Sequence, residues 1–136
     1  MDDCIFCKII KGEIPCAKIY EDDSVFVFVD IAPVNPGHVL VVPKKHSLDI
    51  MDMEDEDVKK VFLVAKKISK AVMEAMDADG INVGMNNRSA AGQLVMHSHV
   101  HVMPRLKDDG LKLFVGQKYE EGEIEKVKDK ILSKLR

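Results

Sequence analysis

The segment 92–105, GQLVMHSHVHVMPR, places three of the chain's five histidines on alternate residues. Successive side chains of a β-strand point to opposite faces. If this segment is extended, His97, His99 and His101 therefore share one face, and Ser98 lies on the other. Neighbouring imidazoles then start about 7 Å apart, at a rise of roughly 3.3 Å per residue. The three rings can act as one chemical row.

The row has three interpretations. Histidines on an edge strand can be solvated surface residues. A His-x-His pair can also present two imidazoles to a zinc ion. Alternatively, a neutral imidazole can attack phosphorus while a neighbouring imidazole donates to a phosphate oxygen or protonates the leaving group. The third interpretation also accounts for the preceding segment, NNRSAAGQ, in which Asn86, Gly92 and Gln93 offer amides and close backbone approach to an anion.

Hydrophobic patterning around the row predicts an α+β domain. Apolar runs bounded by Asp, Pro and Gly predict strands near residues 17–23, 24–31, 38–43, 81–86 and 95–103. A long amphipathic helix is predicted from residue 55 to about residue 76, with an apolar stripe of Val58, Val61, Phe62, Ala65, Ile68, Val72, Ala75 and Met76. A second stripe, formed by Ile124, Val127, Ile131 and Leu135, predicts a C-terminal helix. We expect a five-stranded, mostly antiparallel sheet with the long helix packed on one face.

Length, composition and charge restrict the class of protein. The 136 residues suit a single domain, 1–136, and no apolar run approaches the ~18 residues of a membrane span. The acidic N-terminus lacks the apolar core of a secretory signal, so we expect a cytoplasmic location. A net charge of −3 argues against a broad basic surface for duplex nucleic acid. The odd number of cysteines, three, favours reduced thiols or a metal site over disulfides.

Residues 97–103, HSHVHVM, resemble the signature of the histidine triad (HIT) superfamily of nucleotide hydrolases and transferases. The resemblance extends in chain order through CIFCKIIKGEIP (4–15), FVDIAPVNPGHVLVVPKKH (28–46) and GQLVMHSHVHVMPR (92–105). It covers residues 1–105 and leaves 106–136 as a C-terminal extension. The resemblance implies the HIT-like fold and a purine nucleotide as the ligand.

The same resemblance implies a role for each matching residue. His99 is expected to be the nucleophile that forms a covalent nucleotidyl intermediate, oriented by the main-chain carbonyl of His97. His101 is expected at the α-phosphate and the departing oxygen, His38 closes the histidine cluster, and Asp30 accepts from the ribose hydroxyls. The apolar wall around the base is then Phe6, Ile9, Phe28 and Ile31, and the phosphate-binding loop is Asn86, Gly92 and Gln93.

Some of these positions have a purely structural alternative. Phe28 and Ile31 can be core residues, Asp30 can close a turn, and Asn86 can cap a strand end. Ser98 departs from the signature, which usually has an apolar residue at that place.

The CIFC segment, which we expect to form a turn, allows a redox motif, half of a zinc site or two buried thiols. By resemblance to zinc-bearing bacterial members of the superfamily, His46 and His97 join Cys4 and Cys7. Such a Cys2His2 set would be a closed, structural zinc site that leaves the other triad histidines free. Cys16 is expected to be an unpaired buried thiol.

The leading hypothesis is therefore an enzyme, a hydrolase or transferase acting at the α-phosphate of a purine nucleotide. Its substrate would be a nucleoside phosphoramidate or a dinucleoside polyphosphate. The alternative is a low-turnover nucleotide-binding or scaffolding protein. Leu94 favours this alternative, because many relatives have a Ser or Thr there whose hydroxyl assists at the phosphate. Family members pair as two-fold dimers, so we also expect a homodimer.

Overall fold

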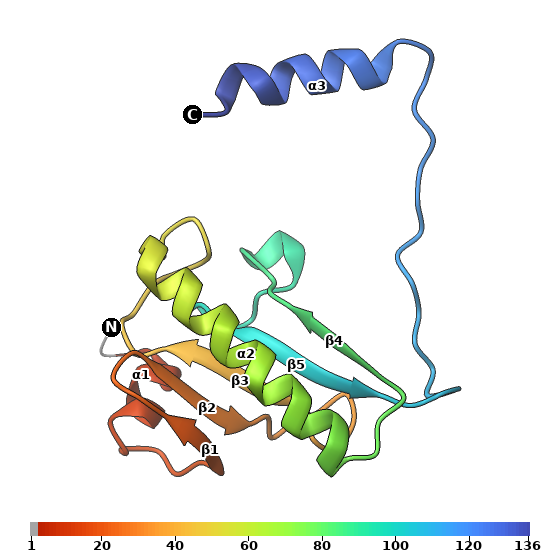
Figure 1. Cartoon of the computed structure of the whole chain (residues 1–136). Helices are drawn as coiled ribbons and strands as arrows, with labels where there is room; N and C mark the ends of the chain where they lie inside the picture. Colours follow the sequence, from red (N-terminus) through yellow and green to blue (C-terminus); the bar gives the residue numbers. More distant parts are fainter. Residues whose placement is uncertain (1–2) are drawn as a thin grey trace.

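A computed structural model describes residues 3–136 and shows an α+β fold built on one five-stranded sheet (Figure 1). Along the chain the elements are α1 (Ile5–Ile10), β1 (Lys18–Glu21), β2 (Val25–Val29), β3 (Val39–Pro43), α2 (Asp55–Ala75), β4 (Gly80–Gly84), η1 (Ser89–Ala91), β5 (Val100–Arg105) and α3 (Glu123–Lys134). The strands lie in the order β1-β2-β3-β5-β4, and every neighbouring pair is antiparallel. The predicted fold class is confirmed. The short helices α1 and η1 were not predicted.

Helix α2 covers one face of the sheet (Figure 1). Its first turn carries three acidic residues, which suit the positive end of the helix dipole. Its buried residues are Val61, Val64, Ala65, Ile68 and Val72, and they join a core with Val25, Val27, Val39, Val41, Val100 and Val102 of the sheet. Phe62, which we expected on the buried stripe, is 37% exposed. It follows Val61 by about 100° around the helix, at the edge of the stripe, and Val64 takes the buried place instead.

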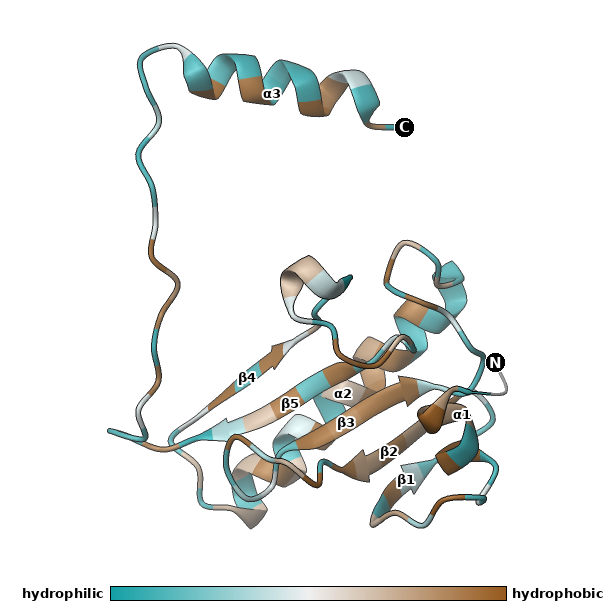
Figure 2. Cartoon of the chain, turned by 180° about the vertical axis from the view of Figure 1, so that it is seen from behind, coloured by the Kyte–Doolittle hydropathy of each residue, from teal (hydrophilic) through white to brown (hydrophobic). Residues whose placement is uncertain are grey.

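The opposite face of the sheet carries a second apolar cluster, formed by Phe6, Ile9, Phe26, Phe28, Leu40 and Val42. Strands β2 and β3 are correspondingly apolar along their whole length in Figure 2. In β5, Val100 and Val102 belong to the core under α2, so the intervening His101 points to the face that bears α1. The candidate site lies on this second face.

Strand β5 is shorter than predicted. We expected a strand over 95–103, but the ladder begins at Val100, so His97 and His99 precede it. The backbone N–H of Ser98 donates to the carbonyl of Ser47 at 2.8 Å rather than to a neighbouring strand. The triad therefore spans a loop and a strand.

The C-terminal extension leaves the sheet after β5. Its chain runs away from the domain before α3, and α3 has no buried residue (Figure 1). Figure 2 shows polar and apolar residues alternating along α3, as expected for an amphipathic helix. Within residues 3–136, no helix is both long and apolar enough to cross a membrane.

Candidate active site and metal centre

A cavity of about 450 Å³ opens on the face of the sheet that carries α1. This size suits a small-molecule ligand. Of the residues predicted from the sequence, its walls contain Phe6, Ile9, Phe28, Asp30, Ile31, His38, Asn86, Gly92, His99 and His101. His97 and Gln93 do not line it. The chain thus brings most of the predicted set together from α1, β2, β5 and the two segments that follow β2 and β4.

The protonation of His99 is fixed by the backbone. Its Nδ1 lies 2.7 Å from the carbonyl oxygen of His97, which can only accept, so Nδ1 carries the proton. Nε2 is then left with a free lone pair. The ring of Phe6 packs edge-on against the imidazole, with centroids 5.1 Å apart, and restricts its rotation.

A second pair of contacts fixes His101. The backbone N–H of Val34 donates to Nδ1 of His38 at 3.0 Å, so the proton of neutral His38 must sit on Nε2. That Nε2 lies 2.9 Å from Nδ1 of His101, to which it donates. His101 therefore carries its own proton on Nε2. The ring centroids of His101 and His99 are 5.0 Å apart. The ring that carries the free lone pair, His99, therefore lies next to the ring that carries the Nε2–H donor, His101.

Burial keeps these imidazoles neutral. Removal from water, then the neighbouring His99 and His38, lower the pKa of His101 to about 4. Burial also lowers the pKa values of His99 and His38, and for both the Asp30 carboxylate opposes this effect. At pH 7 the site thus offers uncharged imidazoles with defined tautomers.

The two carboxylate oxygens of Asp30 have different surroundings: one closes a turn, and the other faces the histidines. Its Oδ1 accepts from the backbone N–H of Ala32 at 2.9 Å, which closes a turn as the structural alternative supposed. Its Oδ2 lies 3.5 Å from Nε2 of His38. Asp30, His38 and His101 are close enough to hold a metal ion. However, the Val34 contact makes Nε2 of His38 a donor, and the lone pair on Nδ1 of His101 accepts from it, so neither nitrogen has a free lone pair to offer a cation.

The loop above the histidines is shaped by Gly92 and Gln93. Gly92 has a φ of +93°, a conformation that side chains disfavour, and a Cβ added there would lie 3.4 Å from Nδ2 of Asn86. Gln93 is buried at 3% exposure. Its amide donates to the carbonyls of Leu48 and Val95 and accepts from the backbone N–H of Arg88. Gln93 therefore holds the loop from inside, and its side chain has no free group to offer to a phosphate.

The apolar wall includes residues of two kinds. Phe28 is buried at 4% and belongs to both the core and the cavity, whereas Ile31 is 98% exposed and stands at the rim. Leu94, also on the rim, is 91% exposed. The sequence did not single out Ile14, Pro15, Cys16, Leu40 and Val95 as wall residues. Ile14 and Pro15 belong to the segment 4–15 that resembles the family, and this is the only sequence signal for them. Nothing local marks Cys16, Leu40 and Val95, because they reach the cavity only through the tertiary fold.

A separate cluster of metal-ligating atoms lies behind the histidine row. Nδ1 of His97 is 3.3 Å from Sγ of Cys4, 3.5 Å from Sγ of Cys7 and 3.2 Å from Nδ1 of His46. The other nitrogen of His97, Nε2, donates to the carbonyl of Pro43 at 2.8 Å, so Nδ1 keeps its lone pair. All four residues are brought together as the resemblance implied.

The four atoms fit a zinc ion in their chemistry and spacing. Metal–ligand distances of about 2.0–2.3 Å in a tetrahedron give edges of roughly 3.3–3.8 Å between ligand atoms. The distances around His97 fall close to this range. Burial, followed by the nearby Cys4 thiol, raises the pKa of Cys7 to about 11. A cation would reverse this effect, since coordinated thiols are deprotonated.

Comparison with known proteins identifies the family and the fold. Residues 11–108 match the HIT domain model. The chain belongs to the HIT family. A HIT-like protein of Borreliella burgdorferi is 46% identical over 131 residues, covering 95% of this chain and 94% of the relative. The adenosine 5′-monophosphoramidase of Schizosaccharomyces pombe is 40% identical over 106 residues, covering 78% of this chain and 77% of the relative.

Solved HIT structures superpose closely on this chain. A Streptococcus mutans protein has a TM-score of 0.94 at 37% identity, covering 100% of this chain and 87% of the other. A Bacillus subtilis HIT family member has a TM-score of 0.91 at 38% identity, covering 98% of both chains. A zinc-bound histidine triad protein of Mycobacterium smegmatis has a TM-score of 0.78 at 36% identity, covering 97% of this chain and 96% of the other.

Ser98, which departs from the HIT signature, has a local explanation. It is buried at 1% exposure, and its Oγ accepts from the hydroxyl of Ser47 at 2.8 Å and lies 3.2 Å from the Ser47 carbonyl. The polar group therefore has partners inside the HIT fold. It ties the triad to the loop that carries His46.

Proposed function

We propose that this HIT protein hydrolyses purine nucleotides at the α-phosphate through a nucleotide bound covalently to His99. The observation that carries the proposal is the fixed pair of tautomers, with a free Nε2 on His99 and a protonated Nε2 on His101 in one cavity. A nucleophile needs a lone pair, and the group it expels needs a hydrogen-bond donor. The relation to a monophosphoramidase supports the same reaction class.

The nucleotide would lie with its base between the apolar walls and its ribose at Asp30. The cavity is lined by Phe6, Ile9 and Phe28 at one part and by the histidines at another. Exposed Ile31 covers the base from the rim. In this pose the α-phosphate meets both His99 and His101, and Asn86 with the backbone at Gly92 contacts its oxygens.

The reaction then has two steps. Nε2 of His99 attacks phosphorus, a nitrogen–phosphorus bond forms, and the bond to the leaving group breaks with its electron pair going to the departing atom. The Nε2–H group of His101 donates a hydrogen bond to that atom, which takes its proton from solvent. A water oxygen next attacks phosphorus and gives up a proton to solvent, and the electron pair of the nitrogen–phosphorus bond returns to His99. One water is consumed, and a nucleoside monophosphate is released.

Two classes of substrate fit this scheme. A nucleoside phosphoramidate would release an amine, and a dinucleoside polyphosphate would release a second nucleotide. Both give the same nucleotidyl intermediate, because the chemistry at the α-phosphate is shared. Leu94 places an apolar side chain at the rim where many relatives offer a hydroxyl, so little polar help for the leaving group comes from that position.

Cys4, Cys7, His46 and His97 are the residues that would hold zinc. When bound, the ion would be structural, because four protein ligands close its coordination sphere. The chain's own contribution is positional: the ring of His97 is held by the cluster while its carbonyl orients His99. Reduced thiols of this kind suit the cytoplasm, where we place the protein.

The assembly we propose is a homodimer. Strand β4 is an edge of the sheet, and Val83 on it is 45% exposed. An exposed edge strand needs a cover, and a second copy provides one. Light scattering should give a mass near twice the 15.2 kDa of one chain, and a mass of one chain at micromolar concentration would contradict the dimer.

The proposed chemistry is tested by comparing His99→Asn with His101→Asn, each assayed with adenosine phosphoramidate and diadenosine polyphosphate. We expect His99→Asn to lose activity on the order of 10⁴-fold or more, since the covalent route is gone, while AMP binding by calorimetry persists. His101→Asn should lose less, because the nucleophile stays. Mass spectrometry of a wild-type reaction quenched without acid should show one nucleotidyl adduct within residues 97–101. Comparable turnover in His99→Asn, or an adduct on His38, would contradict the mechanism, and AMP binding without turnover in wild type would favour the binding-protein alternative.

A further inference from the structure

The loop that carries the phosphate-binding residues, loop 86–93, is held from one side by a short stretch after β3, segment 46–50. Three consecutive residues of the segment are bonded to the loop: Leu48 with Gln93, Asp49 with Arg88, and Ile50 with Asn87. The donor–acceptor distances are 2.6, 3.0 and 2.7 Å. The segment and η1, which belongs to the loop, rise from the same end of the sheet (Figure 1).

These bonds place the residues of the loop that face the cavity. Asn86 and Gly92 line the cavity. Each is followed directly in the chain by a residue bonded to segment 46–50, Asn87 and Gln93 respectively. A displacement of the segment would therefore move the groups that we expect at the α-phosphate.

Arg88, between these anchored residues, has a backbone conformation that glycine adopts far more readily. Its φ is +74° and its ψ is 158°. Residues other than glycine are strained in this region and persist there only where their surroundings hold them. The backbone N–H of Arg88 donates to Oε1 of Gln93, and its carbonyl accepts from the N–H groups of Ala91 and Gln93. A glycine would keep these bonds without the strain, so the gain that offsets the strain must come from the arginine side chain.

That side chain pairs with a buried carboxylate. The side chain of Asp49 is 8% exposed, whereas that of Arg88 is 72% exposed. Oδ1 of Asp49 accepts from the backbone N–H of Asp52 at 3.1 Å, which leaves Oδ2 for Nε of Arg88. The Arg88 guanidinium is the main cause that holds the pKa of Asp49 below its usual range. Because a buried carboxylate is costly without its cation, the pair fixes Arg88 and the loop around it.

We propose that Asp49 and Arg88 are positioning residues of the active site. Their ion pair holds loop 86–93 against segment 46–50, so that Asn86 and Gly92 face the α-phosphate that His99 attacks. Neither member of the pair lines the cavity, so the pair acts through the loop and not on the substrate. The inference rests on the proposed function, because it assigns the loop to the α-phosphate.

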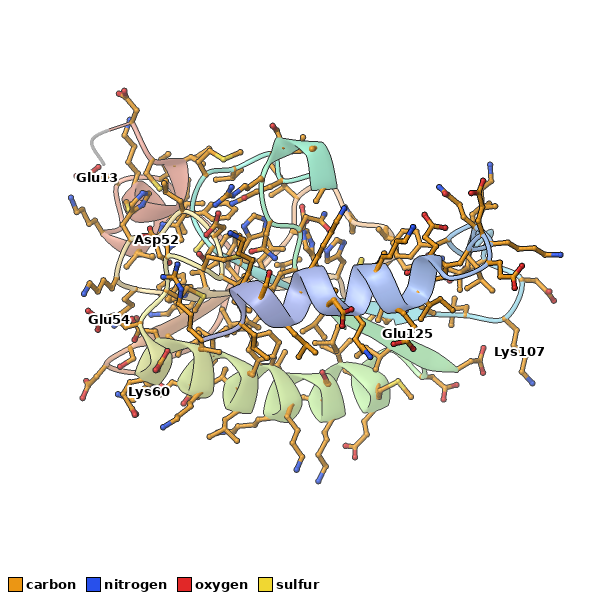
Figure 3. The ribbon with its side chains drawn as sticks, turned by 90° about the horizontal axis from the view of Figure 1, so that it is seen from above. Glu13, Asp52, Glu54, Lys60, Lys107 and Glu125 are labelled. Atoms are coloured by element: carbon orange, nitrogen blue, oxygen red, sulfur yellow. The ribbon has the colours of Figure 1, made fainter. Side chains whose placement is uncertain are left out.

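The ion pair lies far from the C-terminal extension. Asp52, which ends the turn that Asp49 begins, and Lys107, near the start of the extension, lie at opposite ends of the domain (Figure 3). Changes at Asp49 or Arg88 therefore test the loop without disturbing residues 106–136.

The size of the effect follows from the number of bonds. Without the ion pair, the bonds of Leu48 and Ile50 still attach loop 86–93, so the loop shifts rather than unfolds. A shift that costs one hydrogen bond to the phosphate weakens nucleotide binding about tenfold. The affinity for AMP is therefore the quantity to measure.

The experiment is a double-mutant cycle on the full-length protein, with AMP binding measured by calorimetry. Arg88→Ala removes the cation, and Asp49→Asn removes the charge but keeps an acceptor for the turn. We expect each variant to bind AMP about tenfold more weakly than the wild type, and the double variant to bind no more weakly than either one, because both changes remove the same ion pair. Glu56→Gln, which breaks an exposed ion pair with Lys59 on α2, is the control and should leave AMP binding unchanged.

A second pair of variants separates positioning from stability. Arg88→Gly relieves the strained backbone, so it should melt at a higher temperature than Arg88→Ala and yet bind AMP no better. Arg88→Lys keeps a cation opposite Asp49 and should bind AMP more tightly than Arg88→Ala. A purely structural pair would instead make AMP affinity rise with the melting temperature.

Three results would overturn the proposal. The first is AMP binding at wild-type strength in both Asp49→Asn and Arg88→Ala. The second is a loss in the double variant equal to the product of the two single losses, which would show that the residues act separately. The third is AMP affinity that follows the melting temperature from Arg88→Ala to Arg88→Gly. Failure of the proposed function has a different signature, since the wild type would then bind AMP without turning over adenosine phosphoramidate.

Discussion

The neutral state of half-buried His101 makes the stability of the fold depend on pH in a calculable way. Its pKa is lowered to about 4 from the ordinary histidine value of 6.5, chiefly by removal from water. Between these two values the unfolded chain binds a proton at this residue and the folded chain does not. The free energy of unfolding must therefore decrease as pH falls below about 6.5, and this contribution levels off near pH 4.

The size of the effect follows from the same two values. Linkage gives a loss of about 2 kcal/mol for this one group between roughly pH 7.5 and pH 5, where most carboxylates stay ionised. Urea unfolding at the two pH values measures it, and His101→Gln is the control because it removes the titrating ring. We expect the wild type to lose about 2 kcal/mol more than the variant. Equal losses in the two proteins would refute the argument that burial keeps His101 neutral.

Three further predictions concern the metal cluster, the loop before β3 and the triad. Replacing Cys4 and Cys7 with Ser should abolish zinc in metal analysis and lower the melting temperature, because two ligands are lost and bound metal contributes to folding. Wild-type protein that is purified without chelator and contains no zinc would contradict this prediction. Gly37→Ala should lower the free energy of unfolding in urea by about 1–3 kcal/mol, because φ is +97° and the new Cβ would lie 2.5 Å from Cγ of Met76. Adding Met76→Ala to this variant should recover only the part of the loss that comes from the steric contact. Ser98→Ala should cost about 1–2 kcal/mol by leaving the buried Ser47 hydroxyl without its acceptor, and the double Ala variant should cost less than the sum of the two single changes.

The sequence predicted the sheet and the long helix well because their patterns are local. Val25 to Val29 and Val39 to Pro43 are apolar runs between turn residues, and both form strands where expected. The start of β5 was misplaced for a reason that no local pattern records. The backbone N–H of Ser98 donates to the carbonyl of Ser47, a residue far away in the chain. Because this N–H is not available for pairing with a neighbouring strand, the ladder of β5 begins only after it.

The candidate site divides in the same way. Alternation and family resemblance selected the histidines, but only the fold shows which nitrogen of each carries a proton. That choice depends on Val34 for His38 and on Pro43 for His97. Gln93 illustrates the opposite case: an amide beside a phosphate loop looks available in the sequence, whereas its position leaves it fully bonded to backbone.

The exposed rim of the cavity also has a calorimetric consequence. Ile31 and Leu94 are 98% and 91% exposed, so water covers two large apolar side chains at the entrance. A nucleoside that binds there displaces this water, and loss of hydrated apolar surface gives a negative change in heat capacity. Binding heat should therefore become more exothermic as the temperature rises. Shortening either side chain to Ala should reduce that slope even where the affinity changes little, which makes heat capacity a direct measure of how far the rim covers the base.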